Sequence, residues 1–433
     1  MSASAPHSST PHPIPPHGGG GDRWVLGMAP HLQIAVLLLL TAAAFRLPGL
    51  FYPSEEYFDE VYHAKTAKQY LEGQPPTEWV HPPTAKLLIA VGVWAFGYEP
   101  WAWRLAPAIA GTLLAPVFFL FARRVLPTER AALLASVLLL ADGVYLVQSR
   151  IAMTNIFAVL FQVSAALAVL RAALAERLPF LEMSLAGVLL GLALSTRWTS
   201  LWAWGFLGLV LVVVRKRRLF ALRELVLVAI AFLALPAAIY FLSYVPWMLQ
   251  HHSAKEVVTV QRDIWNYHAH LNATHPYFSR WWTWPWLYRP TWYFFRYEEG
   301  WTRGILALGN PALWWASVPV TAWALVTGIR ERDPHRIFSG AGFCFLYLPW
   351  GISPRTLNYG HYLFEAIPYA CLSLGMLLDR YWPTGLPKLY LGIVIGLFLL
   401  FLPFYTAIPV PTAWWHARLF GGPGLWTWFP SWI

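Results

Sequence analysis

The chain of 433 residues is 58% hydrophobic and only 12% charged, whereas a typical soluble protein carries about 25% charged residues. Several apolar runs approach the roughly 20 residues that a helix needs to cross a bilayer. They are continuous rather than alternating, which excludes a β-barrel and predicts an all-α polytopic membrane protein. The net charge of +10 comes from basic residues scattered between these runs, which indicates membrane topology rather than nucleic-acid binding. Both cysteines, Cys344 and Cys371, fall in apolar segments, so no disulfide is expected.

Residues 1–30 are rich in Ser, Pro, His and Gly and lack the basic and apolar regions of a signal peptide. This composition predicts a disordered cytoplasmic tail. His7, His12 and His17 are spaced too loosely to favour a metal site over a solvated tail.

About eleven apolar segments are expected to cross the membrane. They cover residues 31–50, 102–123, 131–148, 151–170, 183–196, 197–214, 224–248, 304–328, 336–352, 358–379 and 388–409. The apolar stretch 84–97 is too short to span, so we expect it to lie in the interface or to re-enter.

Basic residues are concentrated in alternate connections, and this asymmetry sets the orientation. The basic connections include 123–130, 171–177, 215–223, 330–336 and 380–388, which are expected to be cytoplasmic, as is the N-terminal tail. The C-terminus is then external. Four regions follow: the tail 1–30, an N-terminal transmembrane module 31–250 with the external loop 51–101, an external aromatic-rich loop 251–303, and a C-terminal four-helix module 304–433.

Asp59 and Glu60 lie just outside the first apolar segment, on the external side. A carboxylate pair in a chain with so few ionisable groups is a candidate for proton-transfer chemistry. The residues after it have roughly helical apolar spacing up to Tyr70, which predicts an amphipathic juxtamembrane helix. The competing interpretation is that the acids cap the N-terminus of this helix.

Four isolated arginines fall at the external ends of different segments: Arg104, Arg150, Arg197 and Arg355. Together they predict a cationic site, and arginine suits phosphate because of its planar fork of donors. Alternatively, each side chain reaches the lipid headgroups on its own. Asp142 is expected to form a structural ion pair with Arg150. Asn155 is expected to hydrogen-bond across helices.

His81-Pro82-Pro83 predicts a rigid extended turn, because each proline fixes its backbone and lacks an N–H donor. Lys86 follows one turn later and is expected to face the bilayer interface, where it either pairs with phosphate or extends to the headgroups.

The 251–303 loop is dense in tryptophan, including Trp281 and Trp282, and flat rings suit a groove for a sugar or a peptide. His268, His270 and His275 lack an accompanying carboxylate cluster, which disfavours a metal site.

A series of sequence blocks makes the chain similar to one family. The blocks are FDEVYHAKTAKQYLEG (58–73), HPPTAKLLIAVGVWAFG (81–97), QSRIAMTN (148–155), STRWTSLWA (195–203), the 267–294 block, LGNPALWW (308–315) and the stretch 348–369. In order and spacing they resemble the protein O-mannosyltransferases, which use polyprenyl- or dolichyl-phosphate-mannose and have the GT-C architecture. The external loop is too short for the β-trefoil domain of the eukaryotic members, so the bacterial form and the plasma membrane are expected.

The resemblance implies an inverting transfer of mannose from a polyprenyl-phosphate carrier to Ser or Thr of proteins at the external face. Asp59 matches the family's catalytic base and Glu60 its companion acid. Arg104 matches an arginine associated with the lipid phosphate, and His81, Arg150 and the stretch from Arg355 to His361 lie in motifs near the donor. No cofactor is implied, because the lipid-linked sugar is a co-substrate and the arginines replace a metal ion.

Besides the missing β-trefoil domain, the chain departs from the family at a second point: members often carry Asp where this sequence has Thr154-Asn155, which weakens the case for a second acid or a metal ligand there. Two alternatives remain. The first is a transferase of the same architecture that modifies a lipid or glycan. The second is a transporter of lipid-linked sugar, a class with internal repeats that are not evident here.

Overall fold

The computed structural model describes residues 28–250, 252–418 and 424–433, and His7, His12 and His17 lie outside these ranges. The fold is mostly helical, as predicted. The helices are α1 (Pro30–Arg46), α2 (Glu60–Leu71), α3 (Thr84–Phe96), α4 (Pro100–Val125), α5 (Glu129–Leu140), α6 (Gly143–Gln148), α7 (Asn155–Leu174), α8 (Phe180–Leu194), α9 (Ser200–Arg215), α10 (Leu222–Ala229), α11 (Leu235–Ser243), α12 (Val245–Met248), α13 (Ala254–His270), α14 (Pro311–Glu331), α15 (Pro334–Tyr347), α16 (Ile367–Arg380), α17 (Leu386–Thr406) and α18 (Thr412–Trp415).

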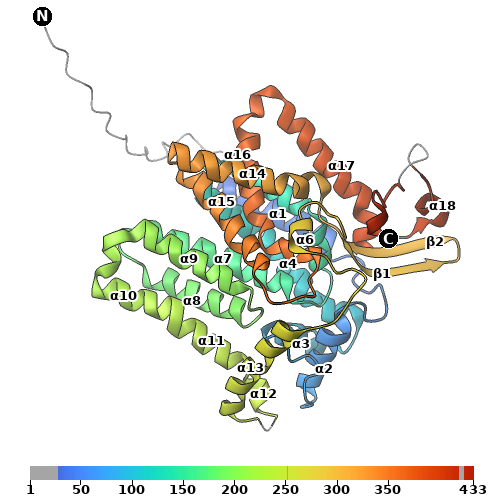
Figure 1. The fold of residues 1–433 in the computed structure, drawn as a ribbon, viewed down its shortest axis with the longest axis horizontal. Coiled ribbons are helices and arrows are strands. Elements are labelled where there is room, and N and C mark those ends of the chain that lie inside the picture. The colour runs from blue at the N-terminus through green and yellow to red at the C-terminus, as the bar shows by residue number, and fades with distance from the viewer. Residues whose placement is uncertain (1–27, 251, 419–423) are drawn as a thin grey trace, which may run out of the picture.

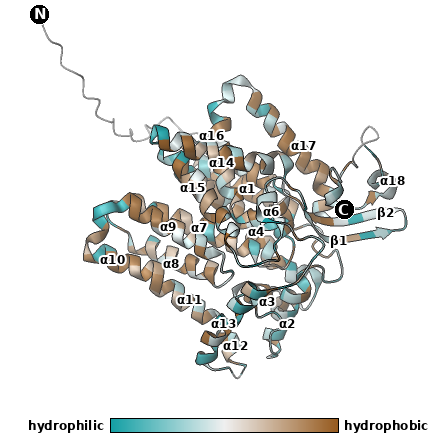
Figure 2. Ribbon diagram, in the orientation of Figure 1, coloured by the Kyte–Doolittle hydropathy of each residue, from teal (hydrophilic) through white to brown (hydrophobic). Residues whose placement is uncertain are grey.

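Each of the eleven expected segments overlaps one or more of these helices. Within the described residues, five helical stretches are long and apolar enough to cross a membrane: α4, α7, residues 222–243, α14 and α17. Figure 2 shows mostly hydrophobic residues along α8, α9 and α11 and hydrophilic residues along α2 and α13. Many large apolar side chains are exposed, including Leu37 and Leu389, as expected for helices that face lipid.

The centre of the bundle is formed by α4 and α7, and α4 also contacts α1, α3 and α5 (Figure 1). Polar residues set the helix ends. Thr128 and Asn310 accept hydrogen bonds from backbone N–H groups in the first turns of α5 and α14, and Ser253 and Glu256 form a capping box at α13.

Two predictions of local structure were wrong. Residues 251–303 are not a loop, because α13 and strand β1 (Thr291–Glu298) fill much of this region. The segment expected at 304–328 begins as strand β2 (Trp301–Ala307), and its helix starts only at Pro311. The apolar character of residues 304–308 is explained by burial of this strand rather than by lipid contact.

The hairpin of β1 and β2 is closed by Glu299 and Gly300, which both have positive φ, as a tight two-residue turn requires. Strand β3 (Val410–Pro411) extends the sheet beyond β2. The register shifts between Trp292 and Phe294. Such a bulge re-aims a side chain, and here Tyr293 stacks on Phe58 with ring centroids 4.1 Å apart.

Asp142 joins the two halves of the chain, and the predicted ion pair with Arg150 was wrong. Its carboxylate caps α6 through Tyr145 N (3.0 Å) and accepts hydrogen bonds from Asn310 N (3.0 Å) and Trp314 Nε1 (2.7 Å). The predicted segment 131–148 is therefore interrupted at Asp142, where α5 ends and α6 begins.

Candidate active site

A cavity of about 580 Å³ lies between the N-terminal parts of α2 and α7, the 77–81 turn, residues 267–275 and the 355–362 segment. Its walls include Asp59, His81, Asn155, Arg197 and Arg355. These residues are far apart in the sequence. The fold thus brings Asp59 together with two of the four arginines that were predicted to form a cationic site.

Asp59 precedes α2, and its side chain makes no capping hydrogen bond, so the capping interpretation was wrong for this acid. Phe58 has a φ of +52°, a left-handed conformation that a bulky residue rarely adopts, and its ring is held by Tyr293. Burial raises the pKa of the Asp59 carboxyl to about 6, although Arg355 and Arg197 pull this pKa down. A carboxylate with a pKa near neutrality suits a general base.

Glu60 points the other way and is fully buried against Arg104. The two side chains form a forked ion pair, with Arg104 Nε 2.8 Å from Glu60 Oε1 and Nη2 2.7 Å from Oε2. Glu60 also accepts a hydrogen bond from Ala152 N at 3.1 Å. This carboxylate therefore connects the acid turn to the 148–155 segment.

The donors of Arg104 are all engaged within the protein. Besides Glu60, it donates to Leu50 O (2.9 Å), Pro53 O (2.6 Å) and Glu55 O (3.0 Å). These bonds and the two to Glu60 account for the five N–H groups of a guanidinium. In this arrangement Arg104 holds the 50–60 segment in place and has no donor left for a phosphate.

Arg150 is also bound to the backbone. Its Nη1 donates to Phe45 O, Arg46 O and Pro48 O at 3.2, 2.9 and 2.6 Å, so it caps the end of α1. It does not line the cavity.

Arg197 lies in the cavity wall, with its guanidinium 4.5 Å from the centre of the Tyr362 ring. Glu365 Oε1 lies 3.3 Å from Arg197 Nε, and Asn155 Oδ1 accepts from Nη1. Asn155, at the start of α7, thus bonds to the turn between α8 and α9 rather than directly to another helix as predicted.

Arg355 also lines this cavity, with its guanidinium 5.9 Å from the centre of the Tyr362 ring. Its Nη1 lies 2.7 Å from His268 Nδ1, which must accept, because His268 Nε2 donates to Val80 O at 2.9 Å. Burial lowers the pKa of His268 to about 3, so this imidazole is neutral near pH 7. Arg355 and Arg197 are therefore the two predicted arginines that can meet a ligand in the cavity.

Lys86 does not face the bilayer, which corrects its predicted position. It is fully buried and donates to the Glu78 carboxylate, to Glu78 O (2.9 Å) and to His81 O (2.6 Å). Glu78 also accepts from His81 Nδ1 at 2.7 Å. Burial disfavours the charged form of Glu78, but Lys86 and His81 favour it more strongly and hold the pKa of Glu78 well below its usual range. The buried ion pair thus supports the turn from which His81 lines the cavity.

His361 and the two tryptophans lie outside the set of residues that line the cavity. His361 packs among Tyr293, Tyr359 and Tyr362 behind the wall. Trp281 packs edge-to-face against both Tyr347 and Trp282.

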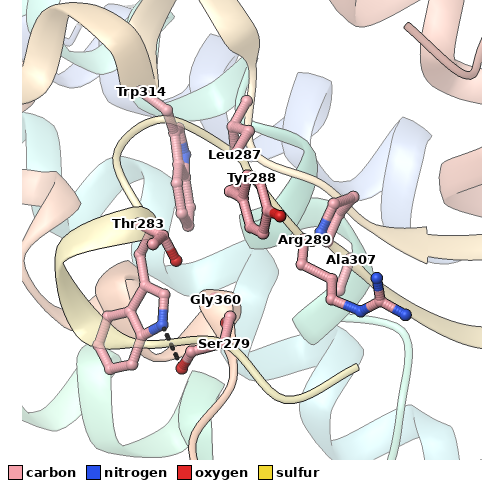
Figure 3. Close-up of a pocket in the computed structure, with 10 residues that line it drawn as sticks. Ser279, Thr283, Leu287, Tyr288, Arg289, Ala307, Trp314 and Gly360 are labelled. Carbon is pink, nitrogen blue, oxygen red and sulfur yellow. Dashed lines mark hydrogen bonds between the residues drawn. The ribbon is translucent and has the colours of Figure 1, made fainter. Parts of the chain in front are cut away.

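A small hollow beside this tryptophan segment is drawn in Figure 3. Ser279 O accepts the indole hydrogen bond of Trp284 there, and the hollow of about 10 Å³ has room for roughly one water molecule. A sugar or a peptide cannot enter it.

Sequence reasoning missed Glu365 and Glu78. Glu365 is buried and accepts from Thr199 Oγ1 (2.7 Å) and Gln162 Nε2 (3.1 Å) in addition to its pair with Arg197. An acid inside an apolar segment needs a partner, which is a signal that points to this residue. Glu78 lies in an unremarkable polar stretch, and only the need of Lys86 for a counter-ion could have indicated it.

Taken together, the cavity holds one carboxylate able to accept a proton and two guanidiniums able to bind an oxyanion. Within the described residues, no group of three or more His, Cys, Asp or Glu side chains could hold a metal ion. The arrangement suits the attack of a hydroxyl group on a centre whose leaving group is a phosphate.

Comparison with known proteins gives matches over nearly the whole chain. The family model described as "Dolichyl-phosphate-mannose-protein mannosyltransferase" matches residues 36–103 and 99–253. The model "C-terminal four TMM region of protein-O-mannosyltransferase" matches residues 253–422. Among curated proteins, the "Polyprenol-phosphate-mannose--protein mannosyltransferase" of Mycolicibacterium smegmatis is 29% identical, over 99% of this chain and 97% of the relative. That of Corynebacterium glutamicum is 30% identical, over 82% of this chain and 81% of the relative.

Solved structures share the fold. The Saccharomyces cerevisiae protein O-mannosyltransferase Pmt1-Pmt2 complex bound to the sugar donor aligns with a TM-score of 0.78 at 13% identity, covering 88% of this chain and 91% of that one. ArnT from Cupriavidus metallidurans bound to undecaprenyl phosphate aligns with a TM-score of 0.54 at 18% identity, covering 86% of this chain and 70% of that one. The chain is thus a multi-pass membrane protein of the GT-C architecture, and it belongs to the protein O-mannosyltransferase family.

Proposed function

We propose that the chain transfers mannose from a polyprenyl-phosphate carrier to serine or threonine hydroxyls of proteins, with inversion at the anomeric carbon. The observation that carries this proposal is the placement of Asp59 in one cavity with Arg197 and Arg355. The relatives at 29–30% identity are named for the same donor and a protein acceptor.

Asp59 is the base in this proposal. It accepts the proton of the acceptor hydroxyl while that oxygen attacks the anomeric carbon from the face opposite the phosphate. The bond from carbon to the phosphate oxygen breaks, and the phosphate leaves with the electron pair. One carboxylate is sufficient, because a phosphate leaving group does not need the proton that glycoside hydrolysis must supply.

Arg197 and Arg355 bind the phosphate and stabilise the charge that it gains on leaving. Glu365 and Asn155 hold Arg197 in position, and His268 holds Arg355. We assign Glu60, Arg104 and Arg150 to the support of the 50–60 and 148–155 segments, since their charged groups bind protein atoms. His81 faces the cavity from the 77–81 turn and is assigned to substrate contact.

The membrane and the acceptor complete the proposal. The distribution of the basic connections supports a cytoplasmic N-terminus and a cavity at the external face of the plasma membrane, as this proposal requires. A serine or threonine in an extended segment can bring its hydroxyl into a cavity of about 580 Å³. We therefore expect acceptors to be modified during export, before they fold.

The test is mannosyl transfer by the purified protein from polyprenyl-phosphate-mannose to a Ser/Thr-rich peptide, with a chelator added and the Asp59→Asn variant assayed alongside. The proposal expects chelator-resistant transfer by the wild type and almost none by the variant. Transfer to lipid or glycan acceptors but to no peptide would overturn the protein-acceptor assignment. Full activity in the variant would remove Asp59 from the role of base.

A further inference from the structure

A second cavity, of about 660 Å³, lies outside the candidate active site between α14, α16 and α17. Its lining is almost wholly apolar and includes Val320 on α14, Leu374 and Leu378 on α16, and Leu389 and Ile393 on α17. In Figure 1, α14 lies beside α16, and it contacts both α16 and α17. We call this cavity the α14–α17 crevice.

The crevice opens on the surface that faces lipid. Two of its three helices, α14 and α17, are among the stretches long and apolar enough to cross a membrane. Leu386 and Leu389 on its rim are 66% and 65% exposed. An opening of this kind in a bilayer is covered by lipid chains, because no water is present to fill it. Its volume is within the usual range of small-molecule sites.

At one end of the crevice, two basic side chains lie near aromatic rings. Arg380 lies 5.9 Å from the ring centre of Tyr381, which lines the crevice. Lys388 lies 5.6 Å from the ring centre of the neighbouring Trp382. The opposite part of the crevice is apolar and uncharged.

Arg380 and Lys388 are free to bind a ligand. Both side chains are exposed, and within the described residues neither forms an ion pair with an acid. Arg130, which contacts the same Trp382 ring, is instead neutralised by Asp379. Two uncompensated cations beside an apolar crevice are complementary to a molecule with an anionic head and an apolar tail.

We infer that the α14–α17 crevice binds one phospholipid with an anionic headgroup, whose acyl chain lies in the crevice and whose phosphate contacts Arg380 and Lys388. Basic groups beside pockets between membrane helices bind anionic lipid headgroups in this way. The 380–388 connection is one of the basic connections, so the lipid comes from the cytoplasmic leaflet. This site is separate from the cavity that contains Asp59, and it does not depend on the proposed mannosyl transfer.

The test measures lipid binding by the full-length protein in detergent, with phosphatidylglycerol and zwitterionic phosphatidylethanolamine as probes. Native mass spectrometry gives the amount bound, and thermal unfolding gives the stabilisation. We expect the wild type to prefer phosphatidylglycerol, and the double variant Arg380→Gln/Lys388→Gln to lose about tenfold to thirtyfold in affinity, from about 1 kcal/mol per cation. Arg217→Gln/Arg218→Gln, which removes two exposed charges from another basic connection, is the matched control and should bind like the wild type.

A variant that narrows the crevice tests the acyl-chain contact without changing any charge. Ala316→Phe adds a ring to the lining and should weaken the binding of both lipids, while peptide mannosylation stays at the wild-type rate. Equal binding of the two lipids by the wild type would overturn the inference, as would unchanged phosphatidylglycerol binding in the double variant. A change in oligomeric state in Ala316→Phe without loss of lipid would identify a second copy of the chain as the occupant and would also overturn it.

Discussion

The cavity and the buried network behind it are built from the same kinds of residue, and they differ in which atoms remain available. On the cavity side, Asp59 makes no capping bond, and Arg197 and Arg355 line the open space. Behind the cavity, Glu60 and Arg104 form a buried ion pair, and their remaining hydrogen bonds go to the protein backbone. A single peptide bond separates the two acids. Residue type alone therefore does not distinguish a group that does chemistry from one that supports it.

The first prediction separates the two acids by their effect on turnover. Asp59→Asn removes the base and should lower kcat by about 10²- to 10⁴-fold while leaving the binding of polyprenyl phosphate nearly unchanged. Asp59 is mostly ionised at pH 7, but burial raises its pKa to about 6, above its value in the unfolded chain, so ionising it costs folding stability and the neutral variant should be no less stable. Kinetic and thermal-unfolding measurements check both points. Asp263→Asn, on the exposed face of α13, is the control.

The second prediction concerns the acid on the buried side. Glu60→Gln keeps the shape of the side chain but leaves Arg104 buried without a counter-charge. It should lower the stability of the protein by about 3–5 kcal/mol, measured by thermal unfolding in detergent. If Glu60→Gln were as stable as the wild type while Asp59→Asn unfolded early, the roles assigned to the two acids would have to be exchanged.

The third prediction applies the same comparison to the arginines. Arg197→Gln removes a charged donor from the cavity and should raise the KM for the lipid-linked donor by about tenfold to a hundredfold. Arg150→Gln removes a cap from α1 and should mainly lower thermal stability. The KM for the lipid-linked donor, measured for both variants at a fixed peptide concentration, tests this difference. Similar KM values would contradict a phosphate site confined to the cavity arginines.

The fourth prediction is the smallest and concerns pH. Because only the ionised form of Asp59 can accept a proton, transfer should decline as the pH falls through about 6 and reach roughly one tenth of its maximum at pH 5. An assay of kcat between pH 5 and 8 measures this decline. A profile that remained flat down to pH 5 would exclude a base with this pKa.

The sequence by itself determined the helical membrane fold, the family and the position of the acid pair. Long apolar runs in the sequence can be assigned to membrane helices directly, because a helix satisfies its own backbone hydrogen bonds whatever surrounds it. The sequence also indicated that arginines gather near the acids. These properties depend on local spacing and on motifs, which do not require knowledge of distant contacts.

Only the tertiary structure decided which charged groups face open space. Lys86, expected at the bilayer interface, is buried because Glu78, eight residues earlier, supplies its counter-charge. Arg104 and Arg150 are occupied by carbonyl groups from the 45–55 segment, whereas Arg197 and Arg355 line the cavity. Burying a charge is costly unless it is paired, so the partner determines where each side chain lies. The carbonyl partners of Arg104 and Arg150 lie about 50 to 100 residues away along the chain, and no local pattern reveals them.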